Sequence, residues 1–350
     1  MSAAGRAILI GSALWIESHP RWIGGALAAD RFYARNAPAF GMDGRSLRMR
    51  QNRASLVRRT SELTNLQFAL LLAVPVVCFL ILVIAYPLGY ALWLSLENVQ
   101  FFGGYQADFV GLANYSDVLN DSAFWHSTWI SVRFTAESVI LTLLVGMGLA
   151  LILNRPMRGR ALVRAIVILP WAVSPYGAGI VFQYLVQGQT GLATAIAYLL
   201  GNPNAINLLT QRWIVELLAI GNAWNIAPLL AFFLLANMAT TPRRLYDLAA
   251  IDRMKRWEIF RHVTLPPLRF TLFVFTCIVM VFSLRVFDYV YTMSRGGPGD
   301  ASEVLTYQLY KVSFQDLNLG YGAAMSFYLL GLILISTALL YVLWGRHETQ

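Results

Sequence analysis

The stretch Leu245-Tyr-Asp-Leu-Ala-Ala-Ile-Asp-Arg-Met-Lys-Arg-Trp-Glu-Ile-Phe-Arg-His-Val-Thr-Leu-Pro266 is polar and charged. It lies between two apolar runs, 213–237 and 268–291, each long enough to cross the hydrocarbon core of a membrane as a helix. We predict that it forms a pair of short helices at the cytoplasmic surface. A membrane protein has little reason to keep a structured loop of this length unless another protein docks on it.

The rest of the chain is equally apolar. Of its 350 residues 57% are hydrophobic and only 13% are charged, and the mean hydropathy is +0.56. This composition excludes an ordinary soluble globular protein. We predict an all-α polytopic membrane protein with six transmembrane helices, at 68–94, 129–153, 163–186, 213–237, 268–291 and 323–344.

The net charge of +9 reflects topology and does not indicate nucleic-acid binding. Segments 1–66, 155–164, 241–269 and 345–350 carry 22 of the 27 basic residues, whereas the alternating segments 97–128, 187–212 and 292–322 carry three. Basic loops remain in the cytoplasm, so both termini are expected there. Attraction to anionic membrane lipid follows from the same distribution.

The chain lacks the signatures of catalysis and of metal or nucleotide binding. Cys78 and Cys277 both lie in apolar spans and are expected to pack there. The four histidines have no metal-ligand spacing, and neither Lys255 nor Lys311 ends a phosphate-binding loop. We therefore expect no catalytic residue, no metal site and no cofactor in this chain.

Three regions follow from these patterns. Residues 1–66 form a basic cytoplasmic extension, 67–345 form the six-span domain with the loop 241–267, and 346–350 form a cytoplasmic tail. The extension is either a set of helices lying on the membrane surface or a poorly ordered tail.

Two spans contain polar residues, which are costly at bilayer depth unless they face the bundle interior or a path. Arg133 and Glu137 stand four residues apart on one helical face, so we expect them to pair. Asn222, Asn225 and Leu229 share a face of the fourth span. These three residues either line a path for a solute across the membrane or form hydrogen bonds between helices.

The quoted loop resembles the EAA loop of ABC importer permeases, in which Glu-Ala-Ala is followed by Asp-Gly-Ala and then by aromatic residues and a Leu-Pro. Asp247 stands at the Glu position, Leu248 and Ala249 at the Ala positions, and Asp252 at the Asp position. Arg253 replaces the Gly that normally allows a tight turn. We expect Arg253 to adopt an ordinary helical or bridging conformation instead.

The resemblance extends over about residues 60–345. Phe109–Tyr115 looks like the outer-loop signature of carbohydrate-type ABC permeases, and Arg164–Trp171 looks like the start of their third core span. It implies the type I ABC importer permease fold in the bacterial cytoplasmic (inner) membrane. It implies a subunit that forms half of a translocation path for a sugar or oligosaccharide.

The implied partners are a second homologous permease subunit, two cytosolic ABC ATPase subunits that bind ATP and Mg, and an extracytoplasmic solute-binding protein. The resemblance also assigns site residues. ATPase coupling falls to Asp247, Ala249, Ala250, Asp252, Trp257, Phe260 and Pro266. Trp257 and Phe260 are expected to anchor against the chain's own cytoplasmic helix ends. The substrate path falls to Asn222, Trp224, Asn225, Ile226, Leu229, Val279, Ser283 and Val286.

Three alternatives stay open. Arg285 near the outer end of the fifth span would suit glycerol-phosphate or another small polar solute, although it could also pair locally with Asp288. A self-contained secondary transporter would need inverted repeats, which are not evident. A membrane-embedded enzyme would need more than His262 with Asp252 and Glu258.

Overall fold

The computed structural model describes residues 65–100, 106–188, 191–201 and 208–344. The chain separates into two compact units, residues 1–80 and 81–350. In the first unit the described part is helix α4, Asn65–Leu80. The expected extension up to residue 64 and the tail 346–350 lie outside the described residues.

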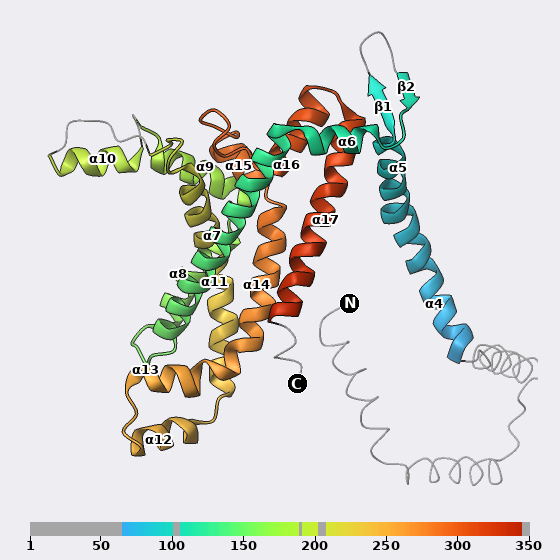
Figure 1. Ribbon diagram of the computed structural model, residues 1–350. Helices are drawn as coiled ribbons and strands as arrows, with labels where there is room; N and C mark the ends of the chain where they lie inside the picture. Colours follow the sequence, from blue (N-terminus) through green and yellow to red (C-terminus); the bar gives the residue numbers. More distant parts are fainter. Residues whose placement is uncertain (1–64, 101–105, 189–190, 202–207, 345–350) are drawn as a thin grey trace, which may run out of the picture. The chain divides into compact units, whose positions relative to one another are not determined.

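The second unit is almost entirely helical (Figure 1). It begins with a π-helical turn, Ile81–Ala85, and α5, Tyr86–Ser95. Strand β1, Glu97–Gln100, then pairs antiparallel with β2, Gln106–Phe109. The helices that follow are α6 Ala113–Asn120, α7 Ser122–Leu153, α8 Arg160–Ala172, α9 Pro175–Val186, α10 Leu192–Leu199, α11 Ile214–Thr240, α12 Arg243–Ile251, α13 Arg256–Ile259, α14 Arg269–Leu284, α15 Asp288–Met293, α16 Leu305–Tyr310 and α17 Leu319–Leu343.

Five helical segments of the described chain are long and apolar enough to cross a membrane, and α8 with α9 makes a sixth if this bent pair counts as one span. The five are Gln67–Ser95, Ser122–Leu153, Ile214–Thr240, Pro266–Leu284 and Leu319–Leu343. Together with the bent pair they correspond to the six expected spans.

Two of the expected spans need correction. The third is not one helix, because α8 and α9 meet at an angle of 98°. Pro175 opens α9, where its missing N–H is tolerated, and the Ser174 hydroxyl caps the same helix by accepting from the Gly177 N–H at 3.2 Å. The fifth span ends at Leu284 and not at residue 291, since the chain turns there before α15.

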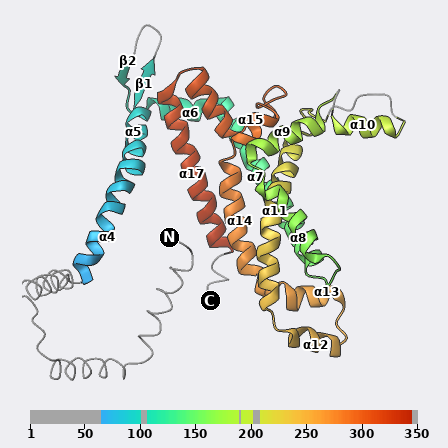
Figure 2. The same ribbon diagram turned by 180° about the vertical axis from the view of Figure 1, so that it is seen from behind.

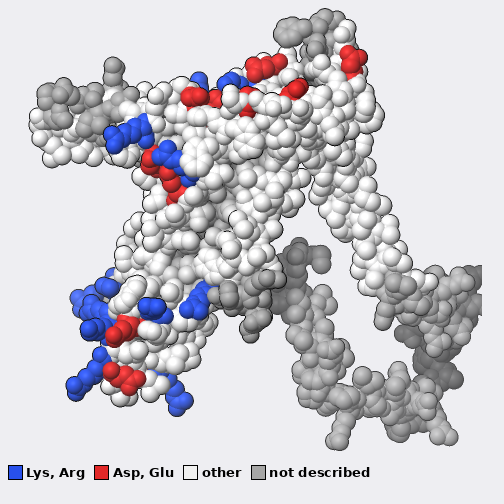
Figure 3. Space-filling model, viewed as in Figure 1, with Lys and Arg blue, Asp and Glu red and all other residues white. Residues whose placement is uncertain are grey.

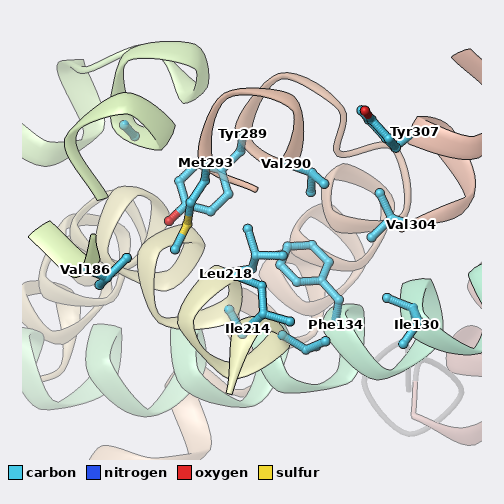
Figure 4. Packing of buried hydrophobic residues seen from close by; sticks show 13 residues of the cluster. Ile130, Phe134, Val186, Ile214, Leu218, Tyr289, Val290, Met293, Val304 and Tyr307 are labelled. Carbon is cyan, nitrogen blue, oxygen red and sulfur yellow. The ribbon is translucent and has the colours of Figure 1, made fainter. Parts of the chain in front are cut away.

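The core of the unit is built on α7 and α11, which pack side by side (Figures 1 and 2). A glycine allows this close approach, because a Cβ on Gly146 would lie 2.7 Å from Cδ2 of Leu230. Phe134, Leu218 and Met293 lie in the adjoining cluster, each almost fully buried (Figure 4). Burial of these side chains away from solvent and lipid holds α15 against α7 and α11.

The expected pair in α7 is confirmed and has a third member. Nε of Arg133 donates to Oε1 of Glu137 at 2.8 Å. Nη2 of the same guanidinium donates to Glu216 of α11. The arginine therefore joins the two central helices as well as two turns of one helix, which lowers the cost of holding all three charges between them.

The unit has two chemically different ends. Helices α12 and α13 lie at one end, and β1, β2, α6 and α16 lie at the other (Figures 1 and 2). Segments 154–164 and 241–269 meet at the α12 end and carry eleven basic residues against three acidic ones, and blue side chains gather there in Figure 3. The basic segments that alternate along the sequence are thus brought together at one end of the unit.

Candidate coupling loop and translocation path

The loop between α11 and α14 folds as a hairpin of two short helices, as expected (Figure 1). Helix α12 begins two residues after α11 ends, and the chain returns through α13, a π-helical turn at Phe260–Thr264 and a 3-10 turn at Pro266–Leu268. Pro266 begins that last turn, where a proline fits because the first N–H of a helix has no partner.

The turn between α12 and α13 corrects the expectation for Arg253. This residue has φ +52°, the left-handed conformation that favours glycine. Its N–H donates to the Ala250 carbonyl at 3.2 Å, and the Met254 N–H donates to the Ala249 carbonyl at 3.0 Å. These two bonds form a Schellman motif. The motif holds the arginine where the resembling loops carry glycine.

One side of α12 is apolar and uncovered. The side chains of Leu245, Leu248 and Ile251 recur at three-residue intervals and are 44%, 56% and 74% exposed. Ala249, in contrast, is buried at 3% and Ala250 is exposed. An exposed apolar ridge on a polar loop is a feature of protein docking surfaces.

Both predicted acids of the loop are exposed. Asp247 and Asp252 form no ion pair within the described part of the chain. The third acid, Glu258, has an internal role, because its carboxylate accepts from the Lys255 N–H at 2.6 Å at the start of α13. Asp247 and Asp252 are therefore free to meet an external cation.

The expectation that Trp257 anchors against the chain's own helix ends is wrong. Its side chain is 66% exposed and stacks on Phe260, with ring centroids 5.4 Å apart and planes inclined by 29°. Phe260 is half-buried. The return of the hairpin is fixed instead by Tyr246 and Thr264, whose hydroxyl oxygens lie 3.3 Å apart across α12 and the π-helical turn.

Two of the predicted path residues meet between α11 and α14. Nδ2 of Asn222 donates to Oγ of Ser283 at 3.1 Å. Ser283 and Val279 lie one turn apart on α14 and are buried, whereas Asn222 is half-buried. The amide therefore keeps one N–H and its carbonyl for a further partner.

Asn225 has a different environment. Its amide nitrogen donates to the carbonyl oxygens of Pro170 at 2.7 Å and Val173 at 2.9 Å. Both carbonyls belong to the break between α8 and α9, where the helical ladder is interrupted. Both amide hydrogens are thus used in holding the bent span.

The other predicted path residues are dispersed. Trp224 is 37% exposed and meets Phe182 of α9 edge-to-face at 5.4 Å. Leu229 packs against the second core cluster, around Leu230 and Leu234, and Ile226 is half-buried. Val286 lies beyond the end of α14, and its carbonyl accepts a hydrogen bond from the Thr306 hydroxyl.

Tyr289 of α15 is a further candidate that sequence reasoning did not single out. The residue is 2% exposed, its hydroxyl has no partner, and its ring lies 6.2 Å from that of Phe182. Desolvation raises the pKa of this phenol, which lies outside the candidate spans, so the hydroxyl stays protonated. The hydroxyl end of the ring lies against Gly221 of α11, so this tyrosine sets the approach of α15 to α11.

Arg285, directly after the last residue of α14, does not form the local pair with Asp288 that the sequence allowed. It is exposed and has no acidic partner among the described residues, Asp288 included. The chain turns between the two residues, so they do not share a helical face.

Comparison with known proteins places this geometry in a family. The family model described as "Binding-protein-dependent transport system inner membrane component" matches residues 142–346, which include α11, the hairpin and α14. The match covers the whole of the proposed coupling and path region.

Three relatives cover most of the chain. The trehalose/maltose transport system permease protein MalF of Thermococcus litoralis is 33% identical over 279 residues, 79% of this chain and 92% of the relative. The sulfoquinovosyl glycerol transport system permease protein SmoG of Agrobacterium fabrum is 29% identical, over 80% of this chain and 91% of the relative. The sn-glycerol-3-phosphate transport system permease protein UgpA of the same organism is 30% identical, over 77% and 91%.

A solved structure has the same fold. A chain of the bacterial alginate ABC transporter, in complex with an alginate pentasaccharide-bound periplasmic protein, superimposes with a TM-score of 0.68 at 19% identity. The superposition covers 80% of this chain and 94% of that chain. With the family match over more than half of the sequence and a 33% identical relative, the chain belongs to the family of inner-membrane components of binding-protein-dependent transport systems.

Proposed function

We propose that this chain is a permease subunit of an ATP-driven importer for a sugar or oligosaccharide, and that the hairpin of α12 and α13 is its dock for a cytosolic ATPase. The observation that carries the proposal is the apolar ridge of Leu245, Leu248 and Ile251, flanked by the unpaired Asp247 and Asp252. A ridge with a charged margin suits insertion into a cleft of a partner protein.

The orientation follows from charge. The hairpin end carries eleven basic residues in the two segments that meet there, and basic loops remain in the cytoplasm. The strands and α16 then face outward, where the binding protein delivers the solute. Both termini are cytoplasmic in this arrangement.

The remaining parts come from other chains. A second, similar permease completes the path, and two ATPase subunits bind ATP and Mg. ATP shifts the pair of permeases toward one conformation because it binds that state of the ATPases more tightly. This chain contributes no reacting group, and its family membership sets aside the enzyme and secondary-transporter hypotheses.

The path side chains suit a sugar. Asn222 retains an amide N–H and a carbonyl, so it can bond to sugar hydroxyls. Trp224 is partly exposed and offers a ring face. The names of MalF and SmoG, which refer to trehalose, maltose and a glycosyl glycerol, are consistent with this substrate class.

One observation favours a second substrate class. Arg285 is exposed at the outer end of α14 without an acidic partner, and a guanidinium is a good phosphate ligand. The similarity to UgpA supports glycerol-phosphate as the alternative. Uptake assays on an Arg285→Gln variant distinguish the two substrate classes. The substitution should strongly lower the uptake of a phosphate ester if that is the substrate, and should change the uptake of a sugar little.

The docking role is tested by purification in a mild detergent. The native chain should bring an ATPase and a second permease with it. Leu248→Asp and Ile251→Asp should abolish ATPase co-purification, whereas Phe314→Asp should not, because Phe314 is also 66% exposed but lies beside α16 at the other end. Retention of the ATPase by both ridge variants would reject the hairpin as the dock.

A further inference from the structure

A polar cavity of about 580 Å³ lies beside the hairpin. It is bounded by Asn154 and Pro156 after α7, by the end of α11 and by the first residues of α8 and α12. The lining residues with polar side chains are Asn154, Arg160, Thr241, Arg243, Tyr246 and Asp247. The cavity shares Asp247 with the margin of the apolar ridge of α12, but it contains none of the three ridge residues and none of the path residues.

The cavity is electropositive for two reasons. Arg160 and Arg243 line it, and each is the first residue of its helix, α8 and α12 respectively. Neither helix has a side-chain cap, because Gly159 and Pro242 stand at the cap positions. Uncapped first-turn N–H groups and the helix dipole favour an anion at both places.

The hydrogen-bonding groups of the cavity are incompletely used. Arg160 donates Nε to the Leu153 carbonyl at 3.1 Å, which leaves its terminal nitrogens free. Arg243 forms no ion pair within the described chain, and Oγ1 of Thr241 is buried without a partner. Asp247 is the single acid of the lining. Two arginines, the first residues of two helices and a single acid thus border the same space.

The position of the cavity identifies the anion. Leu153 and Thr240 end two candidate membrane spans, so the cavity lies at the depth of the lipid headgroups. Headgroup phosphates are concentrated at this depth, and basic pockets between the ends of membrane helices bind them. We propose that the cavity binds the phosphate group of an anionic phospholipid. The proposal needs only that these helix ends lie at a membrane surface.

A phosphate in the cavity would contact the start of α8 and the start of α12 together. Its occupancy would therefore fix the angle of the hairpin relative to the first half of the bent span. Soluble phosphate has the same chemistry, so the test must separate the two sources.

The experiment places the full chain in nanodiscs of phosphatidylcholine with or without phosphatidylglycerol, followed by release into detergent and native mass spectrometry. The native chain should retain phosphatidylglycerol. The double variant Arg160→Gln, Arg243→Gln should retain it about tenfold less, since it loses two charge-assisted contacts. The matched control Arg256→Gln, Arg261→Gln removes two exposed charges of the same loop that do not line the cavity, and should retain lipid normally.

If both double variants lose phosphatidylglycerol to the same extent, the lipid is held by general attraction to a basic surface, and the proposal is overturned. Should the first double variant fold poorly, Arg160→Lys with Arg243→Lys and the single Thr241→Val give graded losses in a folded chain. Unchanged retention in both would also overturn it.

Two further measurements separate the sources. Inorganic phosphate added to the native chain should displace bound phosphatidylglycerol only weakly. Binding of inorganic phosphate without any retention of phosphatidylglycerol would assign the cavity to a soluble anion and overturn the lipid assignment. Retention by the isolated chain but not by the assembled importer would assign it to the ATPase interface instead.

Discussion

The amide nitrogen of Asn225 lies 2.7 Å from the carbonyl oxygen of Pro170, and this bond joins the middle of α11 to the point where the third span breaks. A second bond from the same nitrogen reaches the Val173 carbonyl at 2.9 Å. The break leaves carbonyls without helical partners. One side chain from a distant helix donates to two carbonyls at this break, of which the Pro170 carbonyl also accepts from the Val173 N–H at 3.2 Å, so the bend is a defined part of the fold.

Replacing this side chain should loosen the bent span. Asn225→Leu keeps the volume but leaves the Val173 carbonyl without its donor, at a cost of about 1 to 3 kcal/mol, whereas the Pro170 carbonyl keeps the Val173 N–H. Thermal unfolding in detergent should show a lower midpoint. The control Asn120→Leu removes an amide whose bonds are exposed and local, and should change the midpoint little. Equal midpoints for the two variants would contradict this role.

Gly221 permits α15 to approach α11. A Cβ at this position would lie 1.6 Å from the hydroxyl oxygen and 2.6 Å from Cζ of Tyr289. Gly221→Ala should destabilise the chain by about 1 to 3 kcal/mol through overpacking. Adding Tyr289→Phe should restore part of the loss, because it removes the closest atom.

The matched substitution for that test is Gly148→Ala in α7, where a Cβ would meet nothing within 4 Å. It should be neutral or stabilising by up to about 1 kcal/mol, since alanine favours the helix. A destabilisation as large as that of Gly221→Ala would show that the loss at Gly221 does not come from the contact with Tyr289.

Arg253 offers a stabilising change. Its left-handed conformation costs an L-residue about 1 to 2 kcal/mol, which glycine avoids. Part of that gain is offset because glycine has more freedom in the unfolded chain. Arg253→Gly should raise stability by up to about 1 kcal/mol, and Arg253→Val should lower it, as read by thermal unfolding. A lower midpoint for the glycine variant would mean that the Arg253 side chain itself stabilises the turn.

Transport should depend on the exposed face of the hairpin. Asp252→Ala removes an exposed side chain without an ion pair, and Trp257→Ala removes an exposed ring whose contact is the stack on Phe260, so the chain should still insert into the membrane at normal levels. Uptake and ATPase retention should both fall. Asp316→Ala, an exposed acid near α16, should keep the ATPase bound. Normal uptake by both hairpin variants at equal protein levels would remove the coupling role.

The sequence predicted the spans, the basic surface and the hairpin because these depend on hydropathy and local charge. It also predicted the bond between Arg133 and Glu137, since four residues bring two side chains to one helical face. It could not supply Glu216, which is distant in the chain and meets Arg133 only when α7 packs on α11.

The features that the sequence did not predict also depend on contacts between residues that are distant in the chain or on local hydrogen bonds. The prolines of the third span were visible, but the direction of its bend depends on Asn225 from another helix. The conformation of Arg253 was misjudged because residue preference was weighed without the two Schellman hydrogen bonds. Tyr289 passed unnoticed because an isolated tyrosine has no pattern, and its buried hydroxyl appears only after packing.

Helix α11 has one more consequence. It leads into α12 after only Thr241 and Pro242, and it carries Asn222 eighteen positions before its last residue, Thr240. At a rise of 1.5 Å per residue, about 27 Å of continuous helix separates Asn222 from Thr240, where the hairpin begins. Pro228 interrupts its backbone bonding partway along. If the hairpin moves when an ATPase binds, we therefore expect the displacement to reach Asn222 along this one helix, with Pro228 as the position where it can bend.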